Sequence, residues 1–357
     1  MKNHRSWTAS KTERYNREAL VKKNDKFKVV HDGDIVYNPM NLTIGAVGFN
    51  KTGKSVAVSG YYITMNMNAY FSNNYFKTWL KSANAIKQYK LYATGSLIEK
   101  QRVQFPTLSL IKSYIPNFEE QQKIGTFFQQ LDHLITLHQR KLAKLKELKQ
   151  GYLQKLFPKN GSKFPQLRFA GFADAWEQRS FKTLYKKVIE KNDLSFESDR
   201  IISVANMYYK PNDSKSDEKY METYNIFRLG DIAFEGHKSK NFAYGRFVEN
   251  TIGDGIVSHV FDVFRPISEY DLNYWKYFIH YEDIMGQKLR MSTTKATMMN
   301  NLVSKDFLKQ SVLVPNLDEQ QKIGTFFKQL DDTITLHQGK LEKLQELKKG
   351  YLQKMFC

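Results

Sequence analysis

The sequence predicts a mixed α+β protein in which two strand-rich domains are separated by two long helices that pack as an antiparallel coiled coil. Three observations predict this fold class. A long segment occurs twice, and each copy carries apolar residues at heptad spacing. The stretches before the copies are rich in β-branched and aromatic residues between glycine-bearing turns. The length of 357 residues also suits about two domains.

The repeat is visible by direct alignment. Residues 116–157 and 315–356 are offset by 199 positions, and 32 of their 42 aligned residues are identical. The similarity continues more weakly upstream, where residues 33–37 match residues 230–234. The chain therefore holds two copies of one unit, each with a variable globular part followed by a nearly invariant tail.

The invariant tails are predicted to be long helices. Each begins just after a proline, has acidic residues in its first turn, and continues for about 38 residues, or roughly 57 Å, without another proline. The heptad columns of the first copy are Leu131, His138, Leu145 and Tyr152, and Ile135, Leu142, Lys149 and Leu156. Because one helix cannot bury such a stripe alone, we expect the two tails to pack on each other. His138 and His337 interrupt the seam either to fix its register, which is the preferred interpretation, or to sense pH.

The boundaries follow from this pattern. We predict a first domain at 1–114, a helix at 115–157, a linker at 158–165, a second domain at 166–313 and a second helix at 314–357. The linker contains prolines, a glycine and a serine. Short helices are expected within the domains at about 72–90 and 271–289.

Charge is the strongest compositional signal. The chain has 55 Lys and Arg against 36 Asp and Glu, a net charge of +19, which indicates a polyanionic partner such as nucleic acid. Residues 1–114 hold 18 basic and 6 acidic side chains, whereas residues 163–313 hold 22 and 20. The single cysteine, Cys357, excludes an internal disulfide and a thiolate zinc site. The cysteine usage favours a reducing cytoplasm. No apolar stretch has the length of a membrane span, so we expect no membrane contact.

One motif could carry chemistry. Residues 48–55 read Gly-Phe-Asn-Lys-Thr-Gly-Lys-Ser and fit the phosphate-loop pattern of nucleoside triphosphatases. A phosphate loop leads into a helix, whereas residues 56–64 have a strand-like composition. A hairpin turn through residues 51–54 is therefore the preferred interpretation, and a P-loop NTPase is the alternative of another class. No catalytic, metal-ligating or cofactor-binding residues are assigned.

Candidate DNA-binding side chains lie in polar, glycine-bearing loops next to predicted strands, where Arg, Lys, Asn and hydroxyl groups can reach bases or phosphates. In the first domain they are Asn38, Met40, Asn41, Lys51, Lys54, Thr94, Ser96, Lys100, Gln101 and Arg102. In the second domain they are His237, Lys238, Lys240, Asn241, Arg246, Arg290, Thr293, Thr294 and Lys295.

Several segments resemble conserved regions of the DNA-specificity (S) subunit of type I restriction-modification enzymes. One is the doubled Pro-Asn-x-x-Glu-Gln-Gln-Lys-Ile-Gly before each long helix. Another is Leu-Arg-Phe-Ala-Gly-Phe-Ala-Asp-Ala-Trp-Glu at 167–177, and residues 33–38 and 230–237 supply two more. The resemblance spans nearly the whole chain.

This resemblance implies two target-recognition domains, each reading one half of a split site in double-stranded DNA, and helices whose length sets the unread spacer. It also implies that the helices dock DNA adenine methyltransferase subunits, two of them, and that an endonuclease/translocase subunit joins the complex. S-adenosylmethionine, ATP and Mg would act in those partner subunits, and the S subunit itself would not be catalytic.

The first domain departs from the family pattern. The counterpart of residues 167–177 would lie before Met1, so this domain is expected to be about 35 residues shorter than the second at its start. Missing strands would expose an edge or part of a core. The alternative function is therefore a truncated or silent S-type subunit that docks its partner but reads one half-site.

Overall fold

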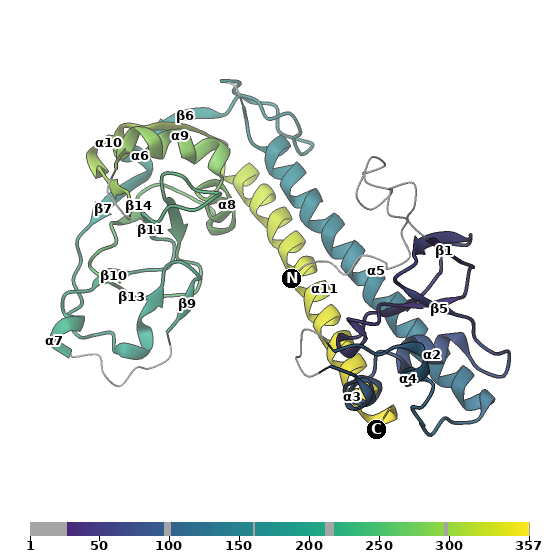
Figure 1. The fold of residues 1–357 in the computed structure, drawn as a ribbon. Helices are drawn as coiled ribbons and strands as arrows, with labels where there is room; N and C mark the ends of the chain where they lie inside the picture. The colour runs from purple at the N-terminus through teal and green to yellow at the C-terminus, as the bar shows by residue number, and fades with distance from the viewer. Residues whose placement is uncertain (1–26, 96–100, 160, 211–217, 296–298, 357) are drawn as a thin grey trace. The chain divides into compact units, whose positions relative to one another are not determined.

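The computed structural model describes residues 27–95, 101–159, 161–210, 218–295 and 299–356 (Figure 1). The chain divides into two compact units. Unit 1 comprises Met1–Lys141 and His337–Cys357, and unit 2 comprises Leu142–Leu336. Both long helices, α5 (Phe118–Leu156) and α11 (Leu317–Met355), therefore contribute residues to each unit.

Unit 1 contains two small antiparallel sheets. One sheet pairs β1 (Phe27–Val30) with β4 (Val56–Ser59). The other has the order β3 (Val47–Phe49), β2 (Ile35–Tyr37), β5 (Ile63–Met65). All three residues of β2 are buried, because its side chains enter two different apolar clusters.

Serine side chains cap the N-termini of two short helices in unit 1. Ser72 accepts a hydrogen bond from the backbone N–H of Tyr75 at the start of α2 (Asn73–Trp79), and Ser82 accepts one from Ala85 at the start of α3 (Ala83–Tyr92). The helix expected at 72–90 is therefore two helices. Among the described residues of unit 1, the other short helices are the 3-10 helix η2 (Leu42–Ile44) and α4 (Phe105–Leu108).

Unit 2 is richer in strands. Its main sheet has the antiparallel order β12 (Arg246–Glu249), β11 (Ile232–Glu235), β14 (Val263–Pro266), β7 (Tyr185–Val188). Four two-stranded pairs accompany it: β10 (Asn225–Phe227) with β13 (Gly255–Val257), β6 (Glu177–Ser180) with β17 (Ser311–Val314), β8 (Ile202–Ser203) with β9 (Tyr208–Tyr209), and β15 (Thr293–Thr294) with β16 (Asn301–Leu302). Its helices are α6 (Phe181–Leu184), η4 (Ser198–Arg200), α7 (Glu218–Met221), α8 (Leu272–Phe278), α9 (Glu282–Ser292) and α10 (Ser304–Lys309).

Aromatic side chains fill the core of unit 2. Phe307 from α10 lies 4.4 Å, centroid to centroid, from both Phe181 and Phe247, and all three are fully buried. Within this unit, α6, α9 and α10 lie at one end, whereas β9, β10 and β13 lie at the other (Figure 1). Burial of such large rings contributes much of the apolar stabilisation.

In each unit the two long helices pack antiparallel, as predicted. In unit 1, Phe127 of α5 contacts Tyr351 of α11 with ring centroids 5.0 Å apart. In unit 2, Tyr152 of α5 contacts Phe326 of α11 at 4.9 Å. Residues near the start of each helix thus meet residues near the end of the other. The two contacts are also repeat counterparts, because each partner is offset by 199 positions.

Lysines in the heptad columns make ion pairs across the helices. Lys149 Nζ lies 2.6 Å from a carboxylate oxygen of Asp331 in unit 2, and Lys348 Nζ lies 2.5 Å from Asp132 in unit 1. These pairs are again repeat counterparts. The seam therefore accepts a lysine at this position because the facing helix supplies a carboxylate.

The seam histidines pair with each other. The Nδ1 atoms of His138 and His337 lie 3.0 Å apart, so a hydrogen bond requires one of the two nitrogens to be unprotonated. Desolvation and the neighbouring His138, Lys141 and Lys340 lower the pKa of His337. The pairing agrees with a role in register, while the pH-sensing alternative stays a prediction.

Within the described part of the chain, no helix is both long and apolar enough to cross a membrane. Over the same residues, no group of three or more His, Cys, Asp and Glu side chains is arranged to hold a metal ion.

Candidate nucleic-acid interface

A buried asparagine shapes the glycine-bearing loop that resembles a phosphate loop. Asn50 is fully buried, and its Nδ2 donates to the carbonyls of Val30 and Lys54 at 2.9 Å. Its Oδ1 accepts from the backbone N–H of Thr52 at 3.1 Å. Strand β4 follows this loop in place of a helix, so the P-loop NTPase interpretation is wrong. The hairpin interpretation is also wrong, because β3 pairs with β2 and β4 pairs with β1.

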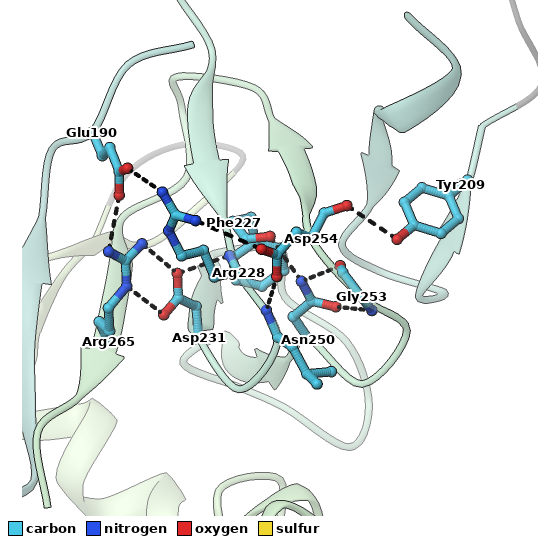
Figure 2. A network of polar contacts seen from close by, with 10 residues as sticks. Glu190, Tyr209, Phe227, Arg228, Asp231, Asn250, Gly253, Asp254 and Arg265 are labelled. Carbon is cyan, nitrogen blue, oxygen red and sulfur yellow. Dashed lines mark hydrogen bonds and ion pairs between the residues drawn. The ribbon is translucent and has the colours of Figure 1, made fainter. Parts of the chain in front are cut away.

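The same turn occurs in unit 2 without any phosphate-loop sequence. Asn250 is fully buried and donates to the carbonyls of Phe227 and Gly253 at 2.8 Å (Figure 2). Its Oδ1 accepts from the backbone N–H of Ile252. The turn is therefore a structural feature common to both units. In each, the side chain of a buried asparagine forms hydrogen bonds with backbone N–H and C=O groups that have no strand partner.

The Gly-Asp motif in each unit also has a structural role. The Asp34 carboxylate accepts from the backbone N–H of His31, and the buried Asp231 carboxylate accepts from that of Arg228. In unit 2, Arg265 donates twice to Asp231 at 3.0 Å (Figure 2). Burial raises the pKa of Asp231, and the arginine hydrogen bonds oppose that shift. The side chain of Arg265 is thus engaged in holding the sheet.

Two predicted loops of unit 1 lie together. The loop that follows β2 joins the 94–102 loop through a hydrogen bond from the Val103 N–H to the Pro39 carbonyl, 2.9 Å. Thr94 and Arg102 pair as an antiparallel bridge, and both are exposed. The candidates Asn38, Met40, Asn41, Thr94, Gln101 and Arg102 belong to these two loops. Ser96 and Lys100 lie outside the described residues.

Unit 2 joins the equivalent loops in the same way. The Asn300 N–H donates to the Gly236 carbonyl at 2.8 Å, and His237 pairs with Met299 as an antiparallel bridge. Strands β15 and β16 pair antiparallel on either side of the second loop, which lies between Thr294 and Asn301 in sequence. The exposed candidates of these paired loops are His237, Lys238, Lys240, Asn241, Thr294 and Lys295, with Thr293 half-buried. Each unit therefore presents two polar loops, here called the paired loops, side by side.

The repeated folds agree with comparisons to known proteins. A family model described as the type I restriction modification DNA specificity domain matches residues 5–147 and 160–346, well over half of the chain. The chain belongs to this family. The fold class is confirmed, with two specificity domains of mixed helix and strand content and the long helices.

A solved S subunit has a similar fold. The S subunit of a type I restriction-modification system from M. genitalium is 13% identical, with a TM-score of 0.57, and the match covers 93% of this chain and 84% of that one. The HsdS subunit from Thermoanaerobacter tengcongensis is 15% identical, with a TM-score of 0.49 and coverages of 95% and 84%.

Some predicted residues lie apart from the paired loops of these specificity domains. Lys51 and Lys54 are exposed in the β3–β4 loop, at the opposite end of β2 from Asn38. Arg246 is held on β12 by Glu235 at 2.5 Å and by the Ala205 carbonyl at 2.9 Å, so its guanidinium is engaged in the fold.

Arg290 also lies outside these loops. It is exposed in the last turn of α9, just before β15 begins. The helix that carries it leads directly into β15, at the start of the second paired loop.

Lys51, a predicted DNA contact, has further lysines of unit 1 near it that the sequence did not single out: Lys77, Lys81 and Lys348. Burial and the ammonium of Lys77 lower the pKa of Lys51, and burial, Lys77 and Lys348 lower the pKa of Lys81. Like charges are gathered here beside Asp132, an arrangement that an anion such as a DNA phosphate would stabilise. The one available signal was the match of Lys77 with Lys276 in the repeat.

Proposed function

We propose that this chain is the DNA-recognition subunit of a type I restriction-modification complex and that each unit reads one half of a bipartite site in double-stranded DNA. The observation that carries the proposal is the pair of equivalent loops in each unit. Both units build these loops on the same strands and hydrogen bonds, yet the loop sequences differ. A shared scaffold with unlike loops suits two unlike half-sites.

The side chains of the paired loops have the chemistry of base readout. Arg102 in unit 1 can donate two hydrogen bonds to guanine, and Asn241 in unit 2 can pair with adenine in the major groove. Lys51 and Lys77 in unit 1 can hold phosphates, which orients the domain without adding sequence information. Binding is expected to weaken as salt rises.

The long helices are proposed to dock methyltransferase subunits. Leu137 on α5 is 54% exposed and its counterpart Leu336 on α11 is 56% exposed; Leu148 and Leu347 are 40% and 47% exposed. Exposed leucines at matching positions of two nearly identical helices suit one kind of partner bound twice. In this proposal S-adenosylmethionine, ATP and Mg act in the partner subunits, the chain itself is not catalytic, and the complex works in the cytoplasm.

Single-molecule sequencing of methylated adenines tests the recognition function. Cells would express the chain with its methyltransferase, either unchanged or with one paired loop altered. Arg102→Ala should relax the first half of the methylated motif and leave the second half intact, and the double change His237→Ala with Lys240→Ala should do the reverse. Each lost base contact should cost about 1–3 kcal/mol of discrimination.

The matched control is Lys305→Ala, an exposed lysine on α10 outside the paired loops. It should leave the motif unchanged. Methylation without sequence preference in the unaltered complex would overturn the proposal. A motif in which only one half is specified would instead favour the S-type subunit that reads a single half-site.

A further inference from the structure

In unit 2 one ion pair closes the first of the paired loops, residues 236–245. Arg246 is the first residue of β12 and pairs directly with Glu235, the last residue of β11. Its Nε donates to the Glu235 carboxylate at 2.5 Å, and the two side chains are only 23% and 13% exposed. The ion pair therefore joins the two ends of the loop where the loop leaves the main sheet.

The same guanidinium contacts two further segments. Its Nη2 donates to the carbonyl of Ala205 at 2.9 Å, in the turn between β8 and β9, and its Nη1 lies 3.4 Å from His280 Nε2, between α8 and α9. His280 Nδ1 lies 3.3 Å from the carbonyl of Phe247 and must carry the proton there, because a carbonyl only accepts. The Nε2 atom is then free to accept from Arg246. Burial and Arg246 lower the pKa of His280, which favours this neutral ring.

The loop itself folds back onto this group. The ring centroid of Phe242 lies 5.4 Å from the Cζ of Arg246, and the ring meets that of His280 edge to face with centroids 4.8 Å apart. Ser239 and Phe242 exchange backbone hydrogen bonds at 3.0 and 3.3 Å, so a tight turn lies between them. Phe242 therefore fastens this turn, which carries the candidate Asn241, to the guanidinium.

Unit 1 closes its equivalent loop without charges. In β2 and β3 the position of the ion pair holds Asn38 and Ala46, and the Asn38 N–H donates to the Ala46 carbonyl at 3.0 Å. The loop between them is residues 39–45, which is shorter than the loop at 236–245. A longer loop loses more conformational freedom when it is ordered. The additional anchor is thus found on the loop that needs it more.

We propose that Arg246 is a positioning residue that determines how specifically unit 2 reads its half-site, without contacting DNA itself. The inference rests on the proposed function. The guanidinium joins β11, the β8–β9 turn, His280 and the first paired loop through the contacts above. A loop that is held in one conformation before binding avoids the cost of ordering on DNA and keeps its polar groups aligned with base edges.

Equilibrium DNA binding by the complex with its methyltransferase tests this role. Duplexes carry the motif found by methylation sequencing, either intact or changed in its first or second half, and fluorescence anisotropy follows binding over a range of salt concentrations. Arg246→Gln should reduce discrimination at the second half by at least ~10-fold and leave discrimination at the first half unchanged. The slope of log affinity against log salt should not change, because no phosphate contact is lost.

A second variant tests the same anchor with the ion pair left in place. Phe242→Leu removes the ring from the guanidinium and should also lower discrimination at the second half. Phe242→Tyr keeps the ring and should discriminate as the unaltered chain does. Lys305→Gln is the matched control, since it also removes one positive charge from unit 2 but lies exposed on α10, outside the paired loops. It should leave both halves unchanged.

Two results would overturn this role for Arg246 alone. One is full discrimination at the second half by both Arg246→Gln and Phe242→Leu, with circular dichroism showing that the variants are folded. The other is weaker binding of Arg246→Gln to every duplex with a salt slope smaller by about 1, which would make Arg246 a phosphate contact. An unaltered complex that does not distinguish the intact duplex from the changed ones would overturn the proposed function as well.

Discussion

Glu249 is a buried carboxylate in the main sheet of unit 2. It is 4% exposed, and neither of its oxygens has a hydrogen-bond partner within the described structure. Burial raises its pKa well above the ordinary value, with Lys276 opposing the shift. Its equivalent in unit 1 is the apolar Phe49, which pairs with Ile35 as Glu249 pairs with Ile232. The buried position thus favours the protonated, uncharged form of the Glu249 carboxyl group.

We predict that Glu249 makes unit 2 less stable as pH rises. Because the folded-state pKa is raised above the unfolded value, the stabilising proton is fully present below the ordinary glutamate pKa and is lost as pH rises through the folded value. Glu249→Gln should increase the thermal unfolding temperature near neutral pH and flatten its decline with pH. Thermal scans from pH 5 to 8 of both proteins would test this, and parallel curves would contradict it.

At the scale of elements, the paired helices depend on charges that interrupt their apolar seam. Asp331 accepts from Lys149 at 2.6 Å and from the Tyr277 hydroxyl at 2.8 Å, and both ends of the ion pair are largely shielded from solvent. Asp332, the next residue, pairs with Lys328 on an exposed face. Asp331 therefore joins the two long helices, whereas Asp332 makes an ion pair within one helix.

We predict that Asp331→Asn destabilises unit 2 by about 1–3 kcal/mol, since a charged hydrogen-bond acceptor is lost while Lys149 keeps its charge at the seam. The control Asp332→Asn should cost no more than about 0.5 kcal/mol, the usual value of an exposed pair within one helix. Denaturant unfolding of both variants gives the comparison. Equal losses in the free energy of unfolding for the two variants would show that the ion pair between the helices does not stabilise unit 2.

At the scale of the whole molecule, duplication gives the chain two nearly identical long helices and two globular parts whose loop sequences differ. The long helices keep their exposed leucines at equivalent positions, whereas the paired loops do not keep their sequences. This division follows if the helices meet one partner twice and each set of loops meets its own half-site.

We predict that Leu137→Ser and Leu336→Ser each remove one methyltransferase subunit from the purified complex and that the double variant removes both. Each substitution takes apolar area out of an interface core. Light scattering coupled to size exclusion measures the mass of each complex. Leu229→Ser is the control, because Leu229 is a similarly exposed leucine outside the helices. Full-mass complexes with the double variant would locate docking elsewhere.

The candidate site could be predicted from sequence in part. Some of the predicted loops are loops in the structure, such as residues 38–41 and 237–241, because turn residues and strand composition are local signals. Others are not, since Arg290 lies in α9 and Thr293 and Thr294 form β15. The loop that contains Lys54 could be interpreted from sequence either as a phosphate loop or as a turn. Its shape depends on the buried Asn50, whose side chain donates to the carbonyl of Val30, 20 residues away, and the sequence does not show that contact. Arg246 was a candidate for DNA contact, but Glu235 and Ala205 engage its guanidinium.

By itself, the sequence determined the duplication, the two long antiparallel helices and the mixed strand-rich domains, because repeat identity and heptad spacing can be read from residues close together in the chain. Only the tertiary structure decided that the 38–41 loop meets the 94–102 loop, and that Lys149 has Asp331 as its partner. Those contacts join residues far apart in sequence, and their energies depend on burial and on distances between backbone groups that no local pattern encodes.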